Sequence, residues 1–194
     1  MSLFSPNNVS SNPLEIVAEN YLRVGGHCVE TIDVDVFVWW IRKVVSSGEQ
    51  TDRLIVDWDV RTFRKYDAIG SLKYLSTLSH TPRPIVIIRN ITDIPEGDSG
   101  IYDNPSTVKE FLFHNWIANH KYNDPKYGKF EINPRDYSII IVWNKESSAK
   151  MNQVWQGETY SIEPDPVPSV IEEYRNKFSK IKLAQHIENA YRNG

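Results

Sequence analysis

The residues that follow a run of four apolar side chains are the first candidates for chemistry in this chain. Residues 85–88 (IVII) predict a strand in the interior of a parallel sheet. The carboxyl end of such a strand is where an α/β protein usually places its site. Arg89 and Asn90 stand there. Carboxylates at this place could hold a magnesium ion and polarise water, whereas an arginine and an amide can do neither. The sequence therefore indicates where a site would lie and argues against hydrolytic chemistry in it.

A second candidate is the pair of carboxylates Asp57 and Asp59 in the segment LIVDWDV. The segment DWDVRT resembles the DxDx(T/V) motif that opens haloacid-dehalogenase-like phosphatases. That resemblance implies a nucleophilic Asp57, an acid/base Asp59 and a magnesium ion between them. The later motifs of that family do not follow in the expected order. Carboxylates that are solvated at a strand end, or that cap the next helix, are the simpler interpretation, and the phosphatase is kept as the alternative.

Nothing in the sequence predicts a bound metal or another cofactor. The five histidines do not show the HxxxH or HExxH spacing of metal sites. Cys28 is the only cysteine, so neither an internal disulfide nor a zinc site built on several cysteines can form. Beside the first predicted strand, this thiol is expected to be a small core residue.

Composition and charge are those of an ordinary globular protein. The chain has 194 residues, 40% of them hydrophobic and 24% charged, and its formal net charge is −3. One domain with a sizeable core is expected. This balance gives no general attraction to nucleic acid, and no apolar run approaches the ~20 residues of a membrane span. We therefore expect a cytoplasmic protein with no membrane partner.

Strand and helix patterns alternate along the chain, which predicts a three-layer αβα domain around a five-stranded, mainly parallel sheet. Between the strands, helical spacing predicts helices over 12–24, 33–48, 66–79, 106–117 and 149–155. We expect a flexible arm over 1–12, the α/β core over 13–166 and an amphipathic helix over 167–194 whose apolar stripe is buried. The predicted strands lie near 28–32, 54–60, 85–91, 137–142 and 159–163.

The order of these segments resembles the core of an AAA+ ATPase, a P-loop fold. The resemblance rests on LIVDWDV, RPIVIIRNITDIP, YSIIIVWNKESSAKMNQVW and TYSIEPDPVP, and it covers about residues 27–175. It implies that Arg89 and Asn90 occupy the places of the two Walker B acids and that Asp93 falls on a later acid. It also places Asn144 at the sensor position and makes the last helix a lid remnant or a docking element.

The phosphate-binding machinery of that family is missing. A P-loop needs glycines, whose backbone N–H groups wrap the phosphates, and a lysine. The corresponding segment ETIDVD has neither residue, and it carries Asp33 and Asp35. We therefore expect a degenerate ATPase domain without ATP hydrolysis, similar to the inactive subunits of clamp loaders, in which the fold serves as a partner surface.

A protein partner is expected on these grounds, such as an intact AAA+ ATPase or an oligomeric assembly. Residues 119–136 are predicted to form a long polar loop of the kind that often carries function. Its mixture of basic and aromatic residues is also compatible with nucleic acid, so a nucleic-acid-associated loader-type subunit is a further alternative. The candidate partner-binding residues of this loop are Tyr122, Lys126, Tyr127, Phe130 and Arg135.

Overall fold

The computed structural model describes residues 13–48, 52–59, 68–78, 82–90, 120–149 and 161–192. The predicted helix near 106–117 and the position of Asp93 lie outside these residues. Most of the predicted helix over 149–155 and all of the arm over 1–12 lie outside them too.

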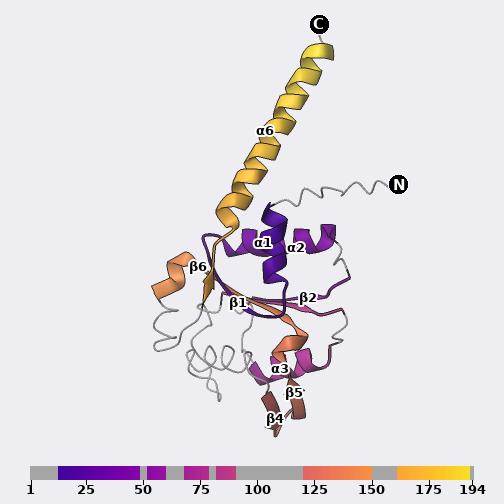
Figure 1. Ribbon diagram of the computed structural model, residues 1–194, viewed down its shortest axis with the longest axis vertical. Helices are drawn as coiled ribbons and strands as arrows, with labels where there is room; N and C mark the ends of the chain where they lie inside the picture. Colours follow the sequence, from indigo (N-terminus) through magenta and orange to yellow (C-terminus); the bar gives the residue numbers. More distant parts are fainter. Residues whose placement is uncertain are drawn as a thin grey trace, which may run out of the picture.

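A five-stranded parallel sheet forms the centre of the fold, as predicted (Figure 1). The strand order is β2-β3-β6-β1-β7. The middle strands β3 and β6 are almost entirely buried because helices cover both faces, which explains their continuous apolar sequences. The five strands are β1 (Gly25–Thr31), β2 (Ile55–Asp59), β3 (Ile85–Arg89), β6 (Ser138–Asn144) and β7 (Ile162–Glu163).

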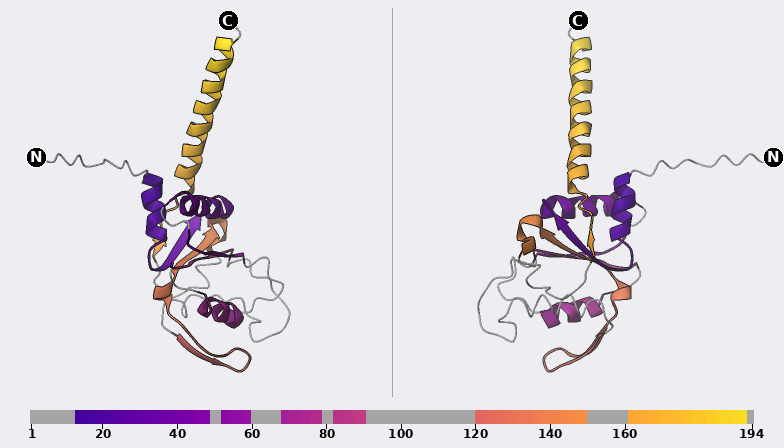
Figure 2. Two further views of the ribbon diagram at one scale, coloured as in Figure 1. Left: turned by 90° about the vertical axis from the view of Figure 1, so that its right-hand side faces the viewer. Right: turned by 60° about the vertical axis from the view of Figure 1, so that its left-hand side comes forward.

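The helices α1 (Pro13–Tyr21) and α2 (Val34–Ser47) cover one face of the sheet, and α3 (Ala68–Ser76) covers the other (Figure 2). A hydrophobic core cluster lies under α1 and α2, where rings pack edge to face: Tyr21 lies 5.6 Å from Phe37 and 6.4 Å from Trp40 between centroids. On the opposite face, the Tyr137 hydroxyl donates a hydrogen bond of 2.9 Å to the carbonyl of Leu75 in α3. The three-layer prediction is therefore confirmed.

One detail of the predicted first elements was wrong. The pair Gly25-Gly26 was expected to end the first helix, but both residues belong to β1 and pair with Ser138 and Ile139. Gly25 has a φ of +112°, a conformation that side chains rarely adopt, and it lets the chain turn directly from the end of α1 into the strand.

The expected loop over 119–136 is instead regular structure. Strands β4 (His120–Asp124) and β5 (Gly128–Ile132) form an antiparallel hairpin, followed by the 3-10 helix η3 (Pro134–Asp136). The Asp124 carboxylate accepts hydrogen bonds from the backbone N–H groups of Lys126 (2.8 Å) and Tyr127 (2.9 Å), and Gly128 has a φ of +72°. This turn chemistry fixes the register of the hairpin.

Arg53 joins three elements at the amino end of the sheet. Its guanidinium donates hydrogen bonds to the carbonyl of Arg83 (2.7 Å), the carbonyl of Leu22 (3.2 Å) and Oγ of Ser138 (2.7 Å). Ser138 is fully buried, and its hydroxyl donates to the same Leu22 carbonyl at 2.5 Å. These bonds tie the end of α1 to the starts of β3 and β6.

The last helix, α6 (Val167–Arg192), begins against the body and then extends away from it (Figure 1). Val167 and Val170 are buried in the core cluster. Phe178 and Ile181, expected on the buried stripe, are 64% and 54% exposed. The expectation of a buried stripe was therefore wrong at these two residues, because α6 extends away from the body there. None of the described helices combines the length and apolar composition that a bilayer-spanning helix requires.

Buried proton-releasing groups predict a loss of stability at alkaline pH. Burial, and then the charge of Glu163, raise the pKa of the Cys28 thiol to about 12, while burial raises the pKa of Tyr21 and of Tyr137. The unfolded chain releases these protons at ordinary pKa values of about 8.5 and 10. The contribution of these three groups to the free energy of unfolding is thus fully present below pH ~8.5. It is lost as the pH rises toward their pKa values in the folded protein.

We expect the urea midpoint to fall between pH 8.5 and 11, since the unfolded state then binds fewer protons than the folded state. The urea midpoint of the variant Cys28→Ala should fall less steeply with pH between about pH 8.5 and 10. A midpoint that stays constant over the whole range, or an identical slope for the variant, would contradict the prediction.

Candidate functional site

The carboxyl edge of the sheet brings together most of the residues that the sequence singled out. Parallel registers place Thr31 opposite Asn144, Arg89 opposite Val142, and Asp59 opposite Arg89. The ends of β1, β2, β3 and β6 therefore meet at one edge, where an open α/β sheet usually binds its ligand.

The connection from β1 to α2 consists of two residues, Ile32 and Asp33. Asp33 is the N-cap of α2, and its carboxylate accepts a hydrogen bond of 3.0 Å from the backbone N–H of Val36. The carboxylate of Asp165 accepts hydrogen bonds of 3.0 Å from the N–H of Ile32 and from the N–H of Val167. Two backbone donors near the start of α2, the N–H groups of Ile32 and Val36, are thus bonded to carboxylates of the chain.

Arg89 at the end of β3 is held by three carboxylates. Its Nε lies 3.0 Å from Oδ1 of Asp57 and 3.8 Å from Oδ2 of Asp59, and its Nη1 lies 2.5 Å from Oδ1 of Asp35. Arg42 of α2 adds a second contact to Asp57, at 2.6 Å. The side chain of Asp57 is only 9% exposed, so this network neutralises a nearly buried charge.

The side chains of Asn90 and Asn144 both form hydrogen bonds within the protein. Asn90 adopts a φ of 60°, which turns the chain off β3, and its amide donates to Oδ1 of Asp59 at 3.1 Å. Asn144 at the end of β6 is the N-cap of the 3-10 helix η4 (Lys145–Ser147), where its side chain accepts from the N–H of Glu146 at 2.8 Å. Both side chains therefore stabilise the chain where it leaves a strand.

The acids of the phosphatase alternative lie on β2, which is one of the two edge strands of the described sheet. Asp57 accepts hydrogen bonds from Arg42 and Arg89, and Asp59 accepts one from Asn90. Two guanidinium groups stand where a magnesium ion would need open carboxylate oxygens. Over the described ranges, His, Cys, Asp and Glu side chains form no group of three or more that could hold a metal ion.

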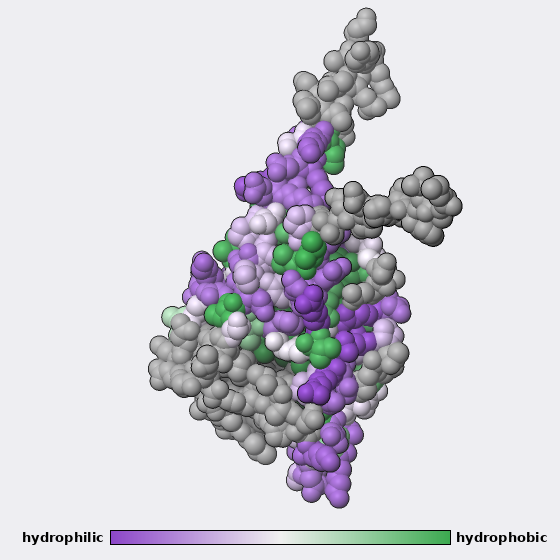
Figure 3. Space-filling model, viewed as in Figure 1, coloured by the Kyte–Doolittle hydropathy of each residue, from purple (hydrophilic) through white to green (hydrophobic). Residues whose placement is uncertain are grey.

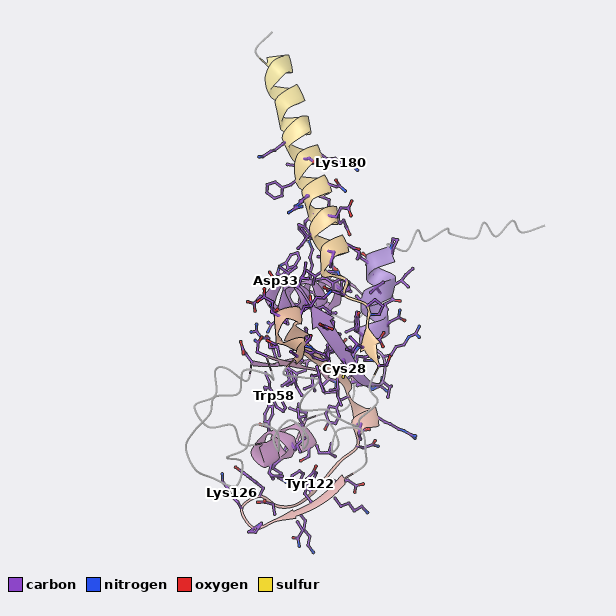
Figure 4. All side chains as sticks on the ribbon, turned by 90° about the vertical axis from the view of Figure 1, so that its left-hand side faces the viewer. Cys28, Asp33, Trp58, Tyr122, Lys126 and Lys180 are labelled. Carbon is purple, nitrogen blue, oxygen red and sulfur yellow. The ribbon has the colours of Figure 1, made fainter. Side chains whose placement is uncertain are left out.

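The candidate partner-binding residues lie on the strands of the hairpin, in its turn and in η3. Tyr122 and Phe130 stack at 4.7 Å between ring centroids, and Lys73 of α3 lies over Phe130. These two half-buried rings contact the body and support the hairpin. Lys126 and Arg135 are exposed, with Lys126 over the ring of the half-buried Tyr127. Figure 4 shows Tyr122 and Lys126 at the end of the molecule opposite Lys180 of α6.

Sequence reasoning missed a groove between α2 and α6, next to the β1–α2 connection. It has a volume of about 610 Å³ and is lined by both apolar and charged side chains. Trp39 is 43% exposed there. The signal was present in the sequence as a tryptophan pair on α2, but which of the two tryptophans faces the core depends on the packing of the helix.

Comparison with known proteins finds no relative: no family model matches the chain, and no curated protein matches it.

Proposed function

We propose that this protein is a non-catalytic domain of AAA+-like architecture that serves as an assembly or adaptor module. The observation that carries the proposal is the β1–α2 connection. A phosphate-binding loop of the P-loop type spans about eight residues with two glycines and a lysine. Here two residues make the connection, and one of them is the carboxylate that caps the helix.

The strand order supports the AAA+-like part of the proposal. Numbered along the chain, the five parallel strands lie in the order 5-1-4-3-2, which is the order of AAA+ domains. In that arrangement the phosphate loop follows the first strand and the Walker B acids end the third. The corresponding places here are Asp33 and Arg89.

The charges at these places support the non-catalytic part. In an ATPase, a lysine and a magnesium ion meet the phosphates, and acids hold the magnesium. In this chain the signs are exchanged: Asp35 stands on the helix that would carry the lysine, and Arg89 stands on the strand that would carry the acids. The two side chains form an ion pair across the space that a triphosphate would need.

Nucleotide titration tests the proposal. Calorimetry and thermal melting with 1 mM Mg-ATP, chosen at about 100 times a Kd of ~10 μM, would reveal such binding as ~2.7 kcal/mol of added stability. We expect neither binding heat nor a shift in Tm, and no release of phosphate. Micromolar binding would overturn the non-catalytic assignment.

The adaptor part has its own test. A pull-down with the protein as bait tests it. A strictly monomeric protein that recovers no stoichiometric partner would contradict the adaptor role. Retention on DNA that weakens steeply with added salt would favour the nucleic-acid alternative instead. No observation on the described residues favours that alternative or the phosphatase over the adaptor.

A further inference from the structure

The groove between α2 and α6 has an apolar floor and charged rims. Val36 and Trp39 of α2 face Ile171, Tyr174 and Phe178 of α6 across it. Its volume of about 610 Å³ is enough for two or three large side chains. Figure 4 places Asp33 close to the base of α6, at one end of this groove.

The aromatic wall of the groove is held in place before anything binds. Trp39 and Tyr174 meet edge to face with ring centroids 4.8 Å apart. The Lys43 ammonium lies 5.3 Å from the Trp39 ring centroid and 4.6 Å from that of Tyr174, and it donates a hydrogen bond to the Tyr174 hydroxyl. Such pre-ordered rings bind with little further loss of side-chain entropy.

Beyond the groove, α6 continues with a short basic stretch that carries two exposed apolar side chains. Residues 175–182 (RNKFSKIK) contain four basic residues and no acidic one, while Phe178 and Ile181 are exposed about one turn apart. Figure 3 shows this part of α6 as mainly hydrophilic with an apolar spot beyond the body. Residues 175–192 extend about 27 Å, and an isolated helix of that length is marginal in water. A partner along this surface would stabilise it.

Charge selects the kind of partner. Two α6 helices laid together over residues 175–182 would oppose four cations with four cations, which disfavours a second copy. A bilayer or a nucleic acid would bring anionic groups against Asp33 and Asp35 on the rim of the groove, and the Asp35 side chain is 72% exposed. A protein helix can instead place its acids on the α6 side alone.

We propose that the α2–α6 groove binds an acidic amphipathic helix of another protein. Large apolar side chains of that helix at i, i+3 or i+4, and i+7 enter between Trp39 and Phe178. Its carboxylates meet Arg175 and Lys180, because Lys177 already pairs with Glu173 of the same helix. This inference rests on the proposed function, because it names the partner class of the assembly module.

A displayed library of random peptides of about 18 residues, the length that spans ~27 Å as a helix, tests the proposal against the full-length protein. We expect the enriched peptides to be acidic and to repeat apolar residues at helical spacing. Enrichment of basic peptides, enrichment without that spacing, or no enrichment would overturn it.

Matched variants assign the binding to the groove. Phe178→Glu should weaken an enriched peptide at least about tenfold, because it places a carboxylate in the apolar contact. Tyr74→Glu, at a 50% exposed aromatic residue of α3 on the opposite face of the sheet, should leave binding unchanged. Lys180→Glu with Lys182→Glu should weaken acidic peptides and strengthen those in which Lys replaces Glu. Melting curves check that each variant is folded.

The outcomes separate this inference from the proposed function. Peptides that bind equally well to Phe178→Glu would show assembly through another surface, so the inference would fail while the adaptor role stands. If light scattering shows a dimer and Phe178→Glu makes it monomeric, the groove binds a second copy of the chain and the inference is overturned. If the protein binds vesicles of anionic lipid and Phe178→Glu abolishes that binding, the groove binds a membrane and the inference is overturned as well. Micromolar binding of Mg-ATP would overturn the proposed function itself.

Discussion

Replacing Arg89 by alanine is expected to lower the free energy of unfolding by about 3 kcal/mol, the lower end of the cost of breaking a buried ion pair. The variant leaves Asp57, whose side chain is 9% exposed, without its contact to Nε, and it leaves Asp35 without its partner. Arg42 still contacts Asp57, but the Arg42 side chain is 52% exposed and screened by water. Urea unfolding followed by circular dichroism at pH 7 measures the change.

The double variant Arg89→Met with Asp57→Leu is the control. It removes the buried carboxylate along with its partner, so it should recover most of the lost stability. The stability of Arg89→Lys should lie between that of the wild type and that of Arg89→Ala. An ammonium group cannot contact Asp57 and Asp35 with the geometry of a guanidinium. A loss below about 1 kcal/mol for Arg89→Ala would show that the pair behaves as a surface ion pair.

At the other end of the sheet, Arg53→Ala should cost about 2–4 kcal/mol, because three hydrogen bonds from one guanidinium are lost together. Two of their acceptors are the carbonyls of Leu22 and Arg83, and the third is the buried hydroxyl of Ser138. Burial, and then the charge of Arg83, lower the pKa of Arg53, so the guanidinium already bears a desolvation cost that these bonds offset.

The variant Arg53→Lys tests whether the stability comes from the three hydrogen bonds of the guanidinium or from its positive charge alone. A lysine keeps the charge but cannot reach three acceptors at once, so its cost should approach that of alanine. The exposed Arg23, close to the same end of the sheet, is the matched control, and Arg23→Ala should change the stability by no more than about 0.5 kcal/mol. Equal losses for Arg23→Ala and Arg53→Ala would refute a special role for Arg53.

The parts of the fold that could be predicted are those in which local sequence and tertiary environment agree. The apolar runs of β3 and β6 are strands with both faces covered, and Asp33 and Gly48 bound α2 as expected. The hairpin was missed because its strands, HKYND and GKFEI, are too polar for a core strand. Its signals were the DPKYG turn and the rings of Tyr122 and Phe130, which stack only once the hairpin has formed.

The location of the candidate site could be predicted from the sequence, but its hydrogen bonds and ion pairs could not. The strand assignments alone bring Arg89, Asn90 and Asn144 to one edge. The ion pairs from Arg89 to Asp57 and Asp35 span 32 and 54 positions of the chain, and they depend on the β2–β3 register and the placement of α2. Phe178 and Ile181 fit a buried stripe by spacing, but their exposure follows from where the sheet ends.

The short connection between β1 and α2 also limits how this chain can change. Point mutations can introduce a lysine or an acid, but they cannot lengthen two residues into the roughly eight of a phosphate loop. An insertion there would separate the Asp33 cap from α2 and the Ile32 N–H from Asp165, so it would first lose stability. A phosphate loop at this connection is therefore out of reach of single substitutions, whichever residues stand at Asp35 and Arg89.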